Sequence, residues 1–278
     1  MTRRLSAACV AFALVTSVRP AQAQEPVDLL LHSAKIFTAN ERLSTFSAVA
    51  VRDGRIVALG WDALREQYRA QRSVDLGGKL VVPGFIDTHI HISGDPERWV
   101  DLSGLETMSE LKARVTRKAE QLGSGEWITG YGHNILIAQQ PNFTYTLDGR
   151  YAEHLDGERY QTNNPLRSPM SHGVFVALGS DILPIGPMVG LYGAVTRKGM
   201  SGAVVGPGEA LTMPEAIVGY TRLAAHLTFE EDEKGSLEVG KLADMVVLSQ
   251  DLLTIDPDRT LETEVEMTIL GGNVVYER

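Results

Sequence analysis

Short β-rich runs at both ends of the chain enclose a middle part of a different character. The first runs lie within residues 27–82 and the last within residues 240–276, each bounded by turns that contain glycine. Runs of β-branched and aliphatic residues between such turns are typical of strands. Two β-rich ends around a mixed middle favour one small β domain that is built from both ends of the chain.

Three turns punctuate these β-rich ends. Asp53-Gly54 lies between two β-rich runs, and this dipeptide is a strong signal for a hairpin. Gly271-Gly272-Asn273 separates 265–270 from 274–276 and predicts a second hairpin. Gly77-Gly78 lies within 74–82 and predicts that the residues on either side form a pair of strands.

The middle of the chain mixes helical and strand patterns. Residues 108–122 repeat apolar side chains at helical spacing. A second helix is expected from Thr212 to Leu227, because Thr212 and Glu215 form a capping-box pattern at its start. Short strands are expected at 127–130 and 136–141. The apolar run of residues 174–181 predicts a strand that ends in a carboxylate.

Composition limits the partners of the chain. Its 278 residues include 26 basic and 35 acidic side chains, a formal charge of −9. Such an acidic chain is not expected to bind nucleic acid or an anionic membrane surface. We therefore expect a small-molecule substrate or ligand.

Residues 1–23 have the pattern of an export signal. Arg3 and Arg4 precede a short apolar run, 7–15, and Ala21-Gln22-Ala23 supplies a small–x–small cleavage pattern. The alternative is a buried N-terminal helix. The pattern predicts an exported protein, periplasmic or secreted. No membrane association is expected once the leader has been removed.

A candidate metal site follows the first β-rich segment. Pro83-Gly84 leads into the apolar run Phe85 to His91, which contains a His-x-His pair. Alternate residues of a strand face the same side, so His89 and His91 would project together as ligands for zinc or a related divalent ion. The alternative is a pair of structural or surface histidines.

Pro83 to His91 resembles the first barrel strand of the amidohydrolase superfamily, and other stretches agree. Residues 74–82 resemble the link from its β domain into its barrel, and 231–244 resemble the segment that returns to that domain. Residues 163–167 and the context of Asp181 resemble the amidohydrolase 3 branch, which includes N-substituted formamide deformylases.

The resemblance implies a fold and a site. The fold class is α/β, with a TIM-like (β/α) barrel beside a small β-sandwich domain formed by both termini. His89 and His91 would hold a divalent metal, with zinc the first candidate. Gly179-Ser180-Asp181 resembles the end of the eighth strand, so Asp181 would be both a ligand and the general base. The alternative for Asp181 alone is a helix N-cap or a loop acid.

The barrel predicted here is truncated. The family barrel usually needs about 250 residues, and the residues between Phe85 and Arg222 leave room for about half of it. The middle strands are missing from the pattern, with a break near residues 131–134. His133 at this break is either the sixth-strand histidine, a further metal ligand, or a loop residue of the second strand. An open barrel leaves strand edges unpaired, and a homo-oligomer would cover them.

These observations predict two domains after the signal peptide of residues 1–23. Residues 24–82 and 230–278 form the β-sandwich, and 83–229 form an incomplete metal-dependent hydrolase barrel. The predicted function is hydrolysis of a non-peptide carbon–nitrogen bond, of the N-substituted amide or formamide type. One alternative is a catalytically inactive fragment that keeps the scaffold and at most weak metal binding. Another is a solute-binding module.

Overall fold

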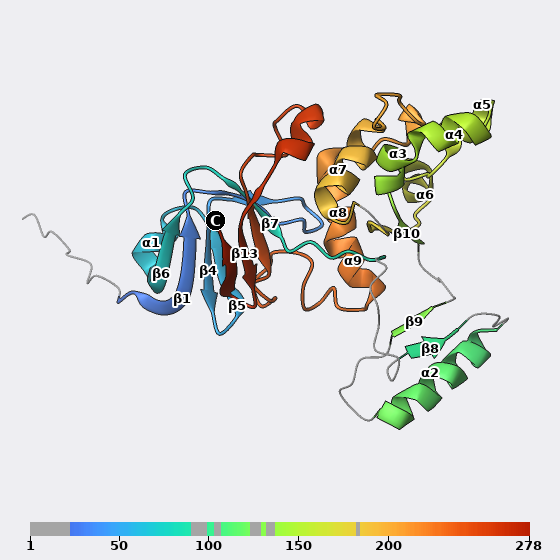
Figure 1. Cartoon of the computed structure of the whole chain (residues 1–278). Coiled ribbons are helices and arrows are strands. Elements are labelled where there is room, and N and C mark those ends of the chain that lie inside the picture. Colours follow the sequence, from blue (N-terminus) through green and yellow to red (C-terminus); the bar gives the residue numbers. More distant parts are fainter. Residues whose placement is uncertain (1–22, 90–98, 103–106, 123–128, 132–136, 182–183) are drawn as a thin grey trace, which may run out of the picture.

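The computed structural model describes residues 23–89, 99–102, 107–122, 129–131, 137–181 and 184–278 (Figure 1). Nearly all of the predicted leader lies outside these residues, as do His91 and His133. In the described part of the chain, no helix combines the length and apolar character needed to cross a membrane.

Two packed sheets form the β-sandwich domain, and both ends of the chain contribute to it (Figure 1). The four-stranded sheet has the order β5-β4-β1-β6, and the six-stranded sheet has the order β14-β13-β12-β7-β2-β3. The strands of the first half are β1 Glu25–His32, β2 Lys35–Phe37, β3 Thr45–Phe46, β4 Ala48–Arg52, β5 Arg55–Gly60, β6 Tyr68–Asp75 and β7 Leu80–Pro83. Those of the second half are β12 Met245–Leu248, β13 Val265–Leu270 and β14 Asn273–Glu277. The predicted β-sandwich formed by both termini is therefore confirmed.

The six-stranded sheet is buried on both faces at its centre. In β12, Met245 and Val247 pack into the core between the two sheets, whereas Val246 and Leu248 pack against the α/β part. This division follows from the alternation of side chains along a strand. It explains why every residue of β7 and β12 is buried. The six-stranded sheet therefore packs against the four-stranded sheet with one face and against the α/β part with the other.

Both predicted hairpins are present. Asp53 and Gly54 have φ values of 51° and 76°, and they connect β4 to β5. Gly271 and Gly272 have φ values of 51° and 75°, and they connect β13 to β14. Positive φ at both central residues is the backbone conformation that two-residue hairpins need to match the twist of their strands.

The strand pair predicted around Gly77-Gly78 is wrong. The residues before the turn belong to β6, which pairs in parallel with β1. The residues after it belong to β7, which pairs in parallel with β2 in the other sheet. Gly77 and Gly78, with φ values of 57° and 89°, turn the chain from one sheet to the next. The strand-turn-strand pattern is the same in both cases, so sequence alone could not separate them.

The α/β part is built around two parallel strands, β10 Ile137–Gln139 and β11 Val176–Leu178. Its helices are α3 Asn142–Thr146, α4 Asp148–His154, α5 Gly157–Thr162, α6 Arg167–Ser171, α7 Pro187–Thr196, α8 Met213–Tyr220 and α9 Arg222–Leu227. Short helices also occur at α1 Leu64–Gln67, η2 Pro207–Glu209 and η3 Pro257–Glu262. The helix predicted from Thr212 to Leu227 is interrupted at Thr221, whose hydroxyl donates to the carbonyl of Ile217.

Two short strands and a helix lie together at the lower right of Figure 1. Here β8 Trp99–Asp101 and β9 Thr129–Tyr131 are parallel, beside helix α2 Met108–Leu122. The helix predicted at 108–122 is confirmed. Among the described strands, the parallel pairs β8-β9 and β10-β11 do not join into a closed barrel, in keeping with the α/β, incomplete-barrel architecture expected from the sequence. The domain boundaries at 82/83 and 229/230 stay predictions.

Candidate metal centre

The segment that ends in His89 lies directly beside the carboxyl end of β11. The sequence predicts a strand from Phe85, but residues 84–89 have no regular strand structure. Single backbone hydrogen bonds hold them in place instead. The amide of Thr88 donates to the carbonyl of Leu178 over 3.4 Å, and the amide of Asp181 donates to the carbonyl of His89 over 2.6 Å. His89 and Asp181, two predicted ligands that are distant in sequence, therefore lie side by side.

Gly179 permits this close approach. A Cβ atom at this position would lie 2.6 Å from the backbone nitrogen of His89 and 2.9 Å from Oδ1 of Asp87. Real Cβ atoms essentially never make contacts this short. Any larger residue at position 179 would therefore push the two segments apart.

His89 and Asp181 direct their polar atoms toward each other. The distance from His89 Nε2 to Asp181 Oδ2 is 3.9 Å, and the two side chains are 34% and 17% exposed. Asp181 has φ of +68°, a left-handed conformation that Asp tolerates better than most residues. The N-cap of the following helix, α7, is Gly186, so Asp181 is not the helix cap considered as an alternative.

The donor set fits a divalent ion. Zinc takes imidazole nitrogen and carboxylate oxygen as ligands, at about 2.0–2.2 Å. His89 Nε2 and Asp181 Oδ2 would supply one nitrogen and one oxygen of such a ligand set. Within the described residues, no group of three or more His, Cys, Asp or Glu side chains is placed to hold a metal. The other two predicted ligands, His91 and His133, lie outside those residues.

Asp87 links the two sides of the site, a role that we did not expect from the sequence. Its Oδ1 accepts hydrogen bonds from the amides of Ser180, at 2.9 Å, and His89, at 3.3 Å. Its Oδ2 accepts a bond from the hydroxyl of Ser180. The only sequence signal for this contact is an acid two residues before the first histidine.

Tyr220 contacts both segments that form the site. Its side chain is 0% exposed, and its hydroxyl lies 3.2 Å from the carbonyl oxygen of Gly179. Its own carbonyl accepts from the amide of Ile86 over 2.8 Å. Burial, and then the charge of Asp87, raise the pKa of Tyr220 well above its ordinary value, so the phenol remains a donor. The helical pattern around Tyr220 gave no hint of this contact.

The loop after Asp181 is held by Asn142 and Ser180. Asn142 Nδ2 donates to the carbonyl of Pro184 over 2.8 Å, and the amide of Gly186 donates to the Ser180 hydroxyl oxygen over 3.0 Å. Tyr220 and Asn142 also lie within hydrogen-bond distance of each other, at 3.2 Å. The described ends of this loop are therefore tied to the same polar groups that support the site.

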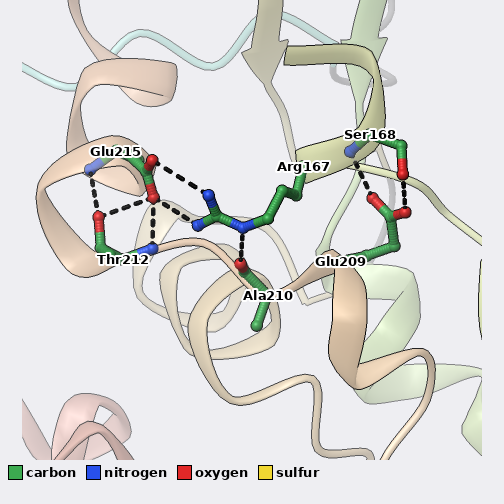
Figure 2. A network of polar contacts seen from close by, with 6 residues as sticks. All are labelled: Arg167, Ser168, Glu209, Ala210, Thr212 and Glu215. Carbon is green, nitrogen blue, oxygen red and sulfur yellow. Dashed lines mark hydrogen bonds and ion pairs between the residues drawn. The ribbon is translucent and has the colours of Figure 1, made fainter. Parts of the chain in front are cut away.

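Figure 2 shows a polar network that connects α6 with the start of α8. Arg167 donates to Glu215 over 2.7 Å and to the carbonyl of Ala210 over 2.7 Å. Glu215 also completes the capping box with Thr212 that the sequence predicts. In the same network Ser168 donates to Glu209 through both its amide and its hydroxyl. This network joins α6 to η2 and to the start of α8.

The remaining histidines with described positions serve other elements. His226 of α9 pairs with Glu231 at 2.7 Å, and His172 Nδ1 lies 2.7 Å from the carbonyl of Ser168. His32 is buried in β1, with Nδ1 3.1 Å from the Ser33 hydroxyl, and His154 ends α4. None of them lies in a described cluster of three or more metal-ligating side chains.

Comparison with known proteins decides the family. A sequence model of the amidohydrolase family, for its amidohydrolase 3 branch, matches residues 72–158 and 140–276 of this chain. Together these ranges cover most of the chain. The chain belongs to the amidohydrolase family.

Two curated relatives are similar to parts of the chain. YtcJ of Bacillus subtilis (strain 168) is 32% identical over 149 residues, which are 52% of this chain and 28% of that protein. The N-substituted formamide deformylase of Arthrobacter pascens is 38% identical over 117 residues, 41% of this chain and 21% of that enzyme. The chain therefore matches less than a third of the length of either relative.

A solved structure agrees in fold. The zinc-bound adenosine deaminase from Xanthomonas campestris aligns with a TM-score of 0.60 at 13% identity, over 92% of this chain and 94% of that one. At this identity the likeness shows the amidohydrolase fold alone.

Proposed function

We propose that this chain is a metal-dependent hydrolase of a non-peptide carbon–nitrogen bond, with an N-substituted amide or formamide as substrate. The observation that carries the proposal is the approach of His89 Nε2 and Asp181 Oδ2 to 3.9 Å across two segments distant in sequence. Membership of the amidohydrolase family supports the reaction class. The similarity to an N-substituted formamide deformylase supports the substrate class.

In this proposal, His89 and Asp181 would hold one divalent ion, and His91 and His133 would be further ligands. When bound, such an ion lowers the pKa of water to about 7 and polarises the amide carbonyl. Asp181 accepts the proton of the attacking water at its carboxylate. It then delivers that proton to the nitrogen of the departing amine, so that the acid and the amine are released neutral overall. Zinc is the first metal to test, because it suits a set of imidazole and carboxylate ligands.

The cellular context belongs to the proposal as well. We propose that residues 1–23 direct export, so that the hydrolase meets small amides outside the cytoplasm. A homo-oligomer in which copies cover the open edges of the parallel strands is the proposed assembly.

A second candidate function is an inactive scaffold with weak metal binding. The observation that favours it is the arrangement of the described parallel strands, which form the separate pairs β8-β9 and β10-β11. An amidohydrolase site normally takes ligands from several strands of a closed barrel. Metal content and turnover separate the two candidates.

The deciding experiment uses the full chain, purified without chelator. Bound metal per chain is measured by elemental analysis, and the elution volume is measured on a sizing column. A panel of N-substituted formamides and amides is then screened for release of free amine. About one zinc ion per compact chain and metal-dependent amine release would support the hydrolase. Metal without turnover would favour the scaffold, and no metal on an aggregated chain would contradict both.

Two variants test the site within this experiment. His89→Ala and Asp181→Asn should each abolish metal-dependent hydrolysis, because one removes a ligand and the other removes both a ligand charge and the proton acceptor. His172→Ala is the matched control, because His172 is exposed and its side chain contacts Ser168 and Ser171 of α6. Unchanged hydrolysis in either site variant would refute the assignment.

A further inference from the structure

The Asp87 carboxylate bonds to both segments of the candidate metal centre. On its own segment, Oδ1 accepts from the amide of His89 at 3.3 Å. On the other segment, Oδ1 accepts from the amide of Ser180 at 2.9 Å, and Oδ2 accepts from the Ser180 hydroxyl. Asp87 thus contacts one residue that is a proposed ligand and one that immediately precedes the other ligand.

These bonds act on the part of the backbone that sets the ligand separation. Ser180 is 0% exposed, so its amide and hydroxyl depend on protein partners for their hydrogen bonds. Its hydroxyl also accepts from Gly186, which ties the next loop to the same point. Without the Asp87 carboxylate, the two ligands would still be joined directly by the hydrogen bond from the amide of Asp181 to the carbonyl of His89.

We infer that Asp87 is a positioning residue that fixes the separation of His89 and Asp181 and so sets the affinity of this site for a divalent cation. The inference rests on the proposed function, because it presupposes that these two residues bind the ion. Residues that orient metal ligands typically change metal affinity about 10–100-fold when they are removed.

The test is a titration of the full-length, metal-free protein with Co²⁺, whose visible absorption reports the coordination of the ion itself. Asp87→Ala should weaken Co²⁺ binding about 10–100-fold, because all three bonds are lost. Asp87→Asn should restore the affinity to within about threefold of wild type, because the amide oxygen still accepts from the amides of Ser180 and His89. A residue that served only the fold would not produce this ranking at constant circular dichroism.

Ser180→Ala keeps the inference testable if Asp87→Ala fails to fold. It removes one of the three bonds to Asp87, and we expect Co²⁺ binding to weaken about tenfold. Ser168→Ala is the matched control, because it removes the same type of hydroxyl–carboxylate bond, to Glu209, away from the metal centre. This control should lower the stability of the fold and leave Co²⁺ binding unchanged.

The outcomes separate the inference from the proposed function. If wild type binds Co²⁺ and both Asp87→Ala and Ser180→Ala bind it equally well, the positioning role is wrong while the proposed function stands. If wild type binds no Co²⁺, the proposed function fails and the inference falls with it. Weakened binding in Ser180→Ala beside normal binding in Ser168→Ala supports both.

Discussion

The backbone amide of Asp181 donates a 2.6 Å hydrogen bond to the carbonyl oxygen of His89. This bond joins the end of β11 to the segment that follows β7, although neither residue lies in a regular strand. Two proposed ligands are thereby brought together by elements that rest on the six-stranded sheet and on α8. The relative position of His89 and Asp181 therefore depends on local contacts at the end of β11.

Gly179→Ala should disrupt this arrangement of His89 and Asp181. The added Cβ would lie 2.6 Å from the nitrogen of His89, a backbone atom that cannot move aside as the end of a flexible side chain can. We expect a loss of about 1–3 kcal/mol in the free energy of unfolding, as in other overpacked positions. Co²⁺ affinity should fall as well, because the two ligand segments separate. Urea unfolding and Co²⁺ titration measure the two effects.

Gly149→Ala is the control for the added methyl group. Gly149 lies in α4, and nothing lies within 4 Å of the position that its Cβ would take. Replacing a helical glycine by alanine stabilises a helix by about 0.5–1 kcal/mol. Opposite signs for the two variants are expected, and a similar stability for both would contradict the close packing at Gly179.

Arg197→Met should strongly destabilise the α/β part. The Arg197 guanidinium is fully buried and donates to the carbonyls of Val205 at 2.9 Å, Asn163 at 2.9 Å and Asn164 at 3.2 Å. Burial lowers the pKa of Arg197 to about 10, so it stays charged at neutral pH. Its loss leaves these carbonyls without their donor, and each buried polar group left unsatisfied costs about 1–3 kcal/mol.

The measurement for Arg197 is urea unfolding beside Arg259→Met. Arg259 pairs with Glu262 on the surface at 3.0 Å, and such a pair contributes at most about 1 kcal/mol. Equal losses in the two variants would mean that the buried guanidinium does not hold the loop of Asn163 and Asn164 in place.

The sandwich was predictable because local signals agree with its tertiary structure. Asp53-Gly54 and Gly271-Gly272 take positive φ in tight turns, and their sequence alone indicates this. Gly77-Gly78 carries the same signal but connects two different sheets. Whether the two strands pair with each other or enter different sheets depends on the strands that neighbour each of them. No residue near the turn determines those neighbours.

The sequence proposes ligands for the candidate site, but it does not indicate the residues that hold those ligands in place. His89 and Asp181 follow from a ligand pattern and from resemblance to the amidohydrolases, and the structure brings them together. Asp87, Tyr220 and Asn142 act through contacts between segments distant in sequence. Since a buried phenol in a helix has the same pattern as any core aromatic residue, periodicity could not identify Tyr220 as a support of the site.

Thr212→Ala should destabilise the start of α8. Thr212 accepts a hydrogen bond from the amide of Glu215, and the Glu215 carboxylate accepts from the Thr212 amide at 2.7 Å. Loss of an N-cap threonine costs about 1 kcal/mol, within a range of about 0.5–2. A double-mutant cycle with Glu215→Ala, which removes the reciprocal acceptor, should show coupling between the two residues in urea unfolding. Strictly additive effects would contradict a reciprocal cap.

Acid should weaken the fold through Glu209 and Glu215. Burial alone would raise the pKa of each carboxyl. The opposing hydrogen bonds outweigh it, from Ser168 to Glu209 and from Arg167 and Thr212 to Glu215, so both pKa values lie below the ordinary 4.5. The unfolded chain therefore binds protons first as the pH falls. The stabilisation is fully present above about pH 4.5 and is lost as the pH drops through the lower, folded-state pKa values.

Urea midpoints between pH 7 and pH 3 should therefore decline below about pH 4.5. Glu209→Gln should start from a lower midpoint at pH 7 and decline less steeply, because its position no longer takes up a proton. Glu153→Gln, at an exposed position of α4, should follow wild type. An acid decline equally steep in Glu209→Gln and wild type would show that the hydrogen bonds to Glu209 contribute no pH-dependent stability, and would leave the acid sensitivity to other carboxylates.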